Sequence, residues 1–238
     1  MTIASKLQKI AENEQKVYEA GKTKEWNDFW DAYQDGGTRT SYMYAFSHPN
    51  WNDVTFKPKY DIKPTGKANS MFYNARITNL KTLLDEIGVQ LDTSGVTDAG
   101  SMFYITHTDC IPTIDLTGCD NIVNTFANTY CPTIEKIILR DDGTQTYNQP
   151  FLNYSDLKNI VIEGVIGKGF SMAQCSKLTV DSMKSVIAAL KNYVGTEYES
   201  TYKLTLHDNA WNRLEASGSA PNGSTWKEYV QTVLGWNV

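Results

Sequence analysis

Residues 126–139 read FANTYCPTIEKIIL, in which an aromatic-x-Asn motif precedes a short apolar alternation. The same motif stands at residues 72–74 and 151–153, and residues 103–105 keep the aromatic residue without the Asn. The unit recurs about every 23 residues. A degenerate repeat of this length, with one short strand signal in each unit, is typical of proteins whose units stack along one axis. The sequence therefore predicts a solenoid.

The strand signals are the apolar alternations at residues 114–116, 137–139 and 160–162. Each alternation ends 11 or 13 residues after the aromatic residue of its unit. In an earlier unit, residues 79–87 read as a helix inserted before a strand at residues 89–91. We therefore expect an α/β fold, a right-handed leucine-rich-repeat solenoid of about six irregular rungs with short stacked strands.

The N-terminal residues 3–34 read as a helix with an apolar stripe formed by Ile3, Leu7, Ile10 and Val17. The spacing of this stripe matches positions a and d of a heptad, which favours a homo-oligomer held by a short coiled coil. The alternative is that the helix caps the first rung of the solenoid. Both interpretations remain open, because two heptads alone form a marginal coiled coil.

The pattern changes again after the last repeat. Asp181 can N-cap a helix, residues 202–206 read as a strand, and Thr225 with Glu228 forms a capping box for a last helix. Polar-faced ends of this kind close a stack of repeats. The predicted parts are a helical N-terminal segment with the first cap at 1–65, the solenoid at 66–180 and a small α/β C-terminal cap at 181–238.

Composition limits the classes of partner. The chain has a net charge of −5 and no concentration of Lys or Arg, so it lacks the electrostatic footprint of a nucleic-acid-binding protein. No apolar run reaches 18 residues, so we expect no membrane span. The first eleven residues lack the apolar region of a secretory signal peptide. The 14 Tyr and 6 Trp are more than a small core needs, and they suit either the repeat core or a recognition surface.

A catalytic or metal site has little support in the sequence. Residues 107–110 place His, Asp and Cys together, but nothing beside them supplies an oxyanion hole or a metal-ligand spacing. None of the four cysteines forms a C-x-x-C pair, and residues 164–169 fail the phosphate-loop pattern. We expect no catalytic residues, no metal and no cofactor.

The candidate ligand-binding residues come from the strands. The middle residue of an apolar-x-apolar strand points away from the core, and adjacent rungs lie about 4.8 Å apart. This argument predicts an exposed row across the sheet, made of Asp92, Asp115, Ile138, Val161, Thr179 and Thr205.

Several roles remain open for this row. Asp92 and Asp115 could form the carboxylate pair of a retaining glycosidase, hold a cation such as calcium, or belong to a solvated face. Ile138 and Val161 could begin a protein-binding patch, or the loop at residues 141–150 could cover them.

The order of motifs resembles that of a known group of proteins. The aromatic-x-Asn repeats resemble the BspA-type leucine-rich repeats of bacterial surface proteins, although the standard Asn/Cys ladder after the strand is missing. Residues 19–22, 29–33 and 55–62 look like a module of gut Firmicutes and of their phages' tail or tail-fibre genes, and residues 178–183 and 202–206 resemble the C-terminal cap of that group. The resemblance implies binding to host molecules or cell-surface glycans without chemistry.

The function expected from the sequence is that of a non-enzymatic adhesion or receptor-binding module. It would be displayed on a phage tail, as part of the virion, or on a bacterial surface, and its partner would be a host or bacterial surface protein or a glycan. The alternatives are a polysaccharide-active enzyme on a solenoid and an architectural spacer.

Overall fold

The computed structural model describes residues 13, 43, 45–47, 58, 61–77 and 80–238. The predicted N-terminal stripe of Ile3, Leu7, Ile10 and Val17 lies outside the described residues, as do the motifs at 19–22 and 29–33 and most of 55–62.

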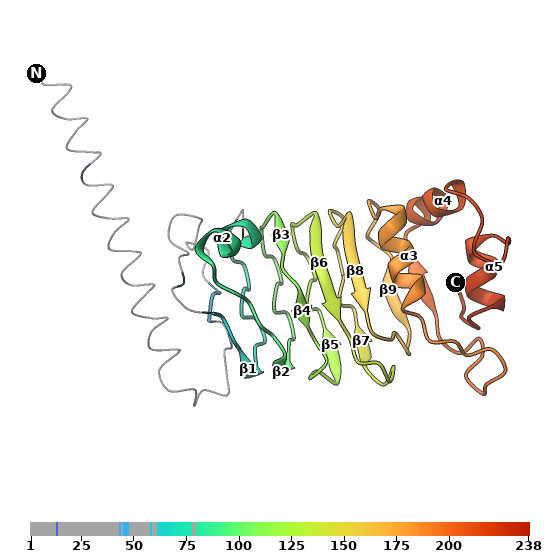
Figure 1. Cartoon of the computed structure of the whole chain (residues 1–238), viewed down its shortest axis with the longest axis horizontal. Coiled ribbons are helices and arrows are strands. Elements are labelled where there is room, and N and C mark those ends of the chain that lie inside the picture. The colour runs from blue at the N-terminus through green and yellow to red at the C-terminus, as the bar shows by residue number, and fades with distance from the viewer. Residues whose placement is uncertain (1–12, 14–42, 44, 48–57, 59–60, 78–79) are drawn as a thin grey trace, which may run out of the picture.

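The described part of the chain contains ten short strands and four helices (Figure 1). The strands are β1 (Thr65–Lys67), β2 (Gly95–Asp98), β3 (Cys110–Ile111), β4 (Ile114–Asp115), β5 (Asn121–Val123), β6 (Thr133–Ile138), β7 (Thr146–Asn148), β8 (Asn159–Glu163), β9 (Phe170–Met172) and β10 (Leu204–Leu206). The helices are α2 (Leu80–Ile87), α3 (Val180–Ala188), α4 (Asp208–Ala216) and α5 (Trp226–Thr232).

All strand pairs are parallel, and the paired residues come from neighbouring repeats. In the four-stranded sheet, β6 pairs with β3, β4 and β8, so that Ile137 lies between Ile114 and Ile162. The other strands form three two-stranded sheets, β1 with β2, β5 with β7 and β9 with β10.

The prediction of a leucine-rich-repeat solenoid is wrong. The described residues form four small parallel sheets of two to four strands instead of one solenoid sheet. The physical reason lies in the backbone of each repeat, because left-handed turns separate strands of only two to six residues. Ladder hydrogen bonding is thereby interrupted several times within each repeat.

These turns explain the aromatic-x-Asn motif. In each of four repeats a Phe is flanked by two residues with positive φ, four positions apart, as at Asn124 and Asn128 around Phe126. Asn tolerates the left-handed conformation better than most residues, so its role in the motif is to shape the backbone. Ile105 takes the same conformation with a φ of 57°, which is strained for a β-branched residue.

The Phe side chains between these turns form a buried ladder. Phe103 stacks on Phe72 at 5.1 Å and on Phe126 at 5.8 Å between ring centroids, and Phe126 stacks on Phe151 at 5.5 Å. The backbone N–H of Phe103 donates to Thr125 O of the next repeat at 2.8 Å. The ladder therefore joins neighbouring repeats through ring packing and backbone hydrogen bonds together.

Helix α2 accounts for the one long repeat. The motif at Phe72 precedes that at Phe103 by 31 residues, whereas Phe103 precedes Phe126 by 23, and α2 contains eight residues. The helix predicted at residues 79–87 is confirmed as Leu80–Ile87, with its leucines buried. The insertion thus leaves the Phe ladder in register.

A helix takes the place of the next strand beyond β8. Thr179 N-caps α3, in place of the predicted Asp181, which lies in the first turn. Ser182 Oγ accepts from Ile160 N at 3.0 Å, and Ser185 Oγ accepts from Ile162 N at 2.9 Å. Side chains of α3 therefore satisfy the open edge of β8, which protects it from pairing with another chain.

Candidate functional site

The structure places only part of the predicted exposed row in register. Asp115 lies opposite Ile138, and Ile138 lies opposite Glu163 instead of Val161. The reason is a shift of register between Ile134 and Ile137 in β6, which moves β8 by one residue relative to the sequence alignment. Val161 is exposed outside this row, and Thr205 is paired with Ser171 between β10 and β9.

The two aspartates of the row close turns at the ends of their strands. Asp92 Oδ1 accepts from the N–H and the Oγ of Ser94, at 3.1 and 2.7 Å. Asp115 Oδ1 accepts from the N–H and the Oγ1 of Thr117, at 2.8 and 2.6 Å. The hydrogen bonds from Ser94 lower the pKa of Asp92, whereas a catalytic acid needs a raised pKa. These geometries suit turn formation, a local role for Asp at strand ends.

The remaining members of the row also have local partners. Thr179 is the N-cap of α3 and accepts from Ser182 N. Ile138 is half-buried and lines a shallow hollow with Arg140 and Glu163. The structure therefore does not bring the six predicted residues together into one site.

A larger concave site lies where the four-stranded sheet ends and the C-terminal segment begins. We call it the tyrosine depression: it has a volume of about 620 Å³ and is lined by residues 142–144, 167–168, 191–193, 196–198 and Tyr202. Its volume is in the range typical of ligand sites.

Three consecutive turns build the floor of the tyrosine depression. Val165 N donates to Arg140 O at 2.9 Å, and Lys191 N donates to Ile166 O at 2.9 Å, so the repeat spacing continues through these turns. Gly167 lies directly against Gly143, because a Cβ on Gly167 would come within 2.0 Å of Gly143 O. Only glycine permits this approach of two backbones.

Aromatic rings form one wall of the tyrosine depression. Tyr193 is buried, and its hydroxyl donates to Gly167 O at 2.5 Å. Tyr202 lies 5.3 Å from the Tyr193 ring, and Tyr198 stacks on Tyr202 at 6.1 Å. Trp236 packs 6.0 Å from both Tyr193 and Tyr202, and its Nε1 donates to Lys191 O at 2.7 Å. The outer ring, Tyr198, is 44% exposed.

Polar and charged groups form the opposite wall. Lys191 Nζ donates to Asp142 O at 3.0 Å, and Asp142 Oδ1 accepts from Thr144 N at 2.8 Å. The hydrogen bonds from Thr144 lower the pKa of Asp142, which keeps this carboxylate charged. The negative charge of Glu197 raises the pKa of Tyr198, so its hydroxyl stays protonated at neutral pH.

Sequence reasoning missed this site. The available signal was the run 193–202, in which three tyrosines fall within ten residues between a helix pattern and a strand pattern. Residues from two repeats and from the C-terminal segment meet here, and only the predicted turn at 141–146 pointed toward one of its walls.

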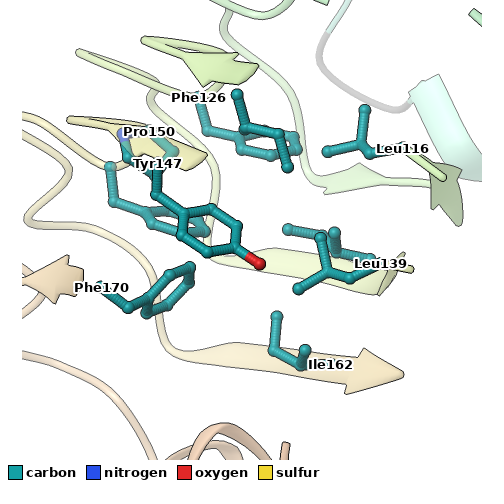
Figure 2. A pocket seen from close by; sticks show the side chains of 10 residues that line it. Leu116, Phe126, Leu139, Tyr147, Pro150, Ile162 and Phe170 are labelled. Carbon is teal, nitrogen blue, oxygen red and sulfur yellow. The ribbon is translucent and has the colours of Figure 1, made fainter. Parts of the chain in front are cut away.

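A second, enclosed cavity lies in the core of the repeats and is not a ligand site. It measures about 10 Å³, and aliphatic and aromatic side chains surround it (Figure 2). The Tyr147 hydroxyl points toward Leu139 and Ile162 in Figure 2 and has no hydrogen-bond partner among the described residues. Burial raises the pKa of Tyr147, so the hydroxyl is neutral. A cavity of this size lacks the several polar partners that a buried water needs.

Two further searches were limited to the described residues. No helix in that part of the chain is both long enough and apolar enough to cross a membrane. Nor do three or more His, Cys, Asp or Glu side chains gather there in a way that could hold a metal ion.

Comparison with known proteins gives no match to a protein family, to a curated protein or to a solved structure. The argument for function therefore depends on the geometry of the tyrosine depression.

Proposed function

We propose that this chain is a non-enzymatic binding module that recognises a surface protein or glycan, with the tyrosine depression as its recognition site. The observation that carries the proposal is the aromatic wall, in which buried Tyr193 and Trp236 hold Tyr202 and the exposed Tyr198 in place. Tyrosine offers a large contact area with a polar tip for little entropic cost, so a pre-positioned tyrosine wall suits binding.

The proposal extends to the place of action. The resemblance of the aromatic-x-Asn repeats to those of BspA-type surface proteins favours display on a phage tail or on a bacterial surface. The partner would then be a protein or glycan of a host or bacterial cell. An enzymatic role gains no support from Asp92 and Asp115, because each carboxylate is used to close its own turn.

The test is binding of the labelled full chain to bacterial and epithelial cells, with a parallel assay for released reducing sugar. We expect saturable binding to at least one cell type and no release of sugar. Absence of saturable binding to every cell type would contradict the binding proposal. Release of sugar that is lost in Asp92→Asn or Asp115→Asn would instead establish a glycosidase.

A further inference from the structure

We infer that the tyrosine depression binds a neutral saccharide, with the exposed faces of Tyr198 and Tyr202 as the platform for a sugar ring. This inference rests on the proposed binding function and names the class of its ligand. A sugar ring carries C–H groups on its faces and hydroxyl groups around its edge. It therefore needs a flat apolar surface bordered by donors and acceptors, and the two walls of the depression supply these features.

The apolar part of the tyrosine depression is aromatic. Its lining contains three tyrosines and no aliphatic side chain, and its remaining residues are glycine, polar or charged. Protein interfaces are larger and bury an apolar centre on each partner. The other large apolar side chains exposed in the described part of the chain include Ile87, Tyr130 and Val161, which belong to different repeats. The surface therefore favours a small polar ligand over a protein.

The platform is rigid before any ligand binds. Tyr202 contacts the rings of Tyr193 and Trp236, and these two are anchored by hydrogen bonds to Gly167 O and Lys191 O. Tyr198 lies nearly parallel to Tyr202, with 19° between the ring planes. Little side-chain entropy remains to be lost on binding, which matters most for weakly bound sugars.

The border of the platform supplies donors and acceptors with balanced charge. Asn192 Oδ1 accepts from Val194 N at 2.9 Å, which leaves the amide NH₂ of Asn192 as a donor toward a ligand. The Lys191 ammonium uses one donor on Asp142 O and has three in total. Two lysines, Lys168 and Lys191, face two carboxylates, Asp142 and Glu197. A site without net charge gives no preference for sulfated, sialylated or uronic acid sugars.

The test is an array of neutral and acidic oligosaccharides probed with the full chain, followed by titration calorimetry of the best sugar. We expect binding to neutral oligosaccharides, with an affinity that changes little between low and high salt. Tyr198→Ala should weaken binding roughly tenfold or more, because the stacking surface is lost. Tyr198→Phe keeps the ring and should stay within about threefold of the parent.

The matched control is Tyr130→Ala. Tyr130 is 51% exposed and stacks on His107 in the repeat region, so it removes a similar surface ring outside the depression. Its sugar affinity should equal that of the parent, and thermal unfolding should show that every variant is folded.

Three outcomes would overturn the inference. Equal sugar binding by Tyr198→Ala and the parent would move the site elsewhere, and binding restricted to acidic sugars would contradict a neutral ligand. Cell binding that resists enzymatic removal of glycans and competition by free sugars would leave the proposed function standing and refute the saccharide. Absence of both cell and array binding would refute the two together.

Discussion

The repeat region, residues 61–178, and the C-terminal segment, residues 179–238, use aromatic residues in opposite ways. In the repeat region, Phe72, Phe103 and Phe126 are fully buried and stack at a regular distance. In the C-terminal segment, Tyr193 is the centre of a cluster, and its neighbour Tyr198 reaches solvent. Repetition gives each equivalent residue the same environment, so its side chains are consumed by packing on the next repeat. The segment that ends the repetition can hold side chains for a ligand.

The largest expected effect comes from breaking the Phe ladder. Phe103→Ala removes a ring that packs on both neighbours, and we expect a loss of about 3–5 kcal/mol in the free energy of unfolding. Chemical denaturation of the full chain measures it. The control is Tyr104→Ala, because this adjacent ring is only partly buried and stacks on Tyr73. Equal losses in the two variants would show that the ladder is not the main support of the repeats.

The next effect concerns the close contact of two turns under the tyrosine depression. Gly167→Ala places a Cβ within 2.0 Å of Gly143 O and should cost about 1–3 kcal/mol, because the turns must move apart. Sugar binding should fall with it. Gly169→Ala is the matched control two residues away, where the nearest backbone atom lies at 3.7 Å, and it should keep both stability and binding. A fully active Gly167→Ala would mean that the depression does not depend on this floor.

Two buried tyrosines sharpen the comparison of the regions. Tyr193→Phe deletes the hydrogen bond to Gly167 O in the C-terminal segment and should cost about 1 kcal/mol. Tyr147→Phe in the repeat region deletes a buried hydroxyl without a partner and should be neutral or stabilising by up to about 1 kcal/mol. Thermal unfolding of both variants checks the sign. A loss of stability in Tyr147→Phe would reveal a hydrogen bond to its hydroxyl.

The repeat region was the more predictable of the two because its signals are local and recur. The Phe-centred turns, the inserted helix α2 and the capping box of Thr225 with Glu228 follow from short motifs, and the structure bears out the helix and the box. The solenoid class was wrong because the left-handed turns divide the strands among separate sheets. The position of Glu163 in place of Val161 depends on a register shift in β6, which no sequence period encodes.

The tyrosine depression could not be derived in the same way. Its residues come from turns after β6 and β8 and from the segment between α3 and β10, so their meeting depends on how the repeats stack. The approach of Gly143 to Gly167 is a tertiary contact over 24 residues, and the tyrosine run carries no period that would mark it as a wall. Local motifs therefore predict the support of the site better than the site itself.

The smallest expected effect separates turn formation from ligand binding. The lowered pKa of Asp92 means that its ionised form is favoured in the folded state, so its contribution exists above the ordinary pKa of 3.8 and disappears as pH falls through the folded-state value. Asp92→Asn should therefore cost a few tenths of a kcal/mol near pH 7, since the group is exposed and screened. In acid the two proteins should converge. Parallel urea titrations at pH 7 and at about pH 2.5 measure the difference, and sugar binding should be unchanged. A large loss of binding in Asp92→Asn would return the strand row to the functional surface, and the repeat region would then share recognition with the C-terminal segment.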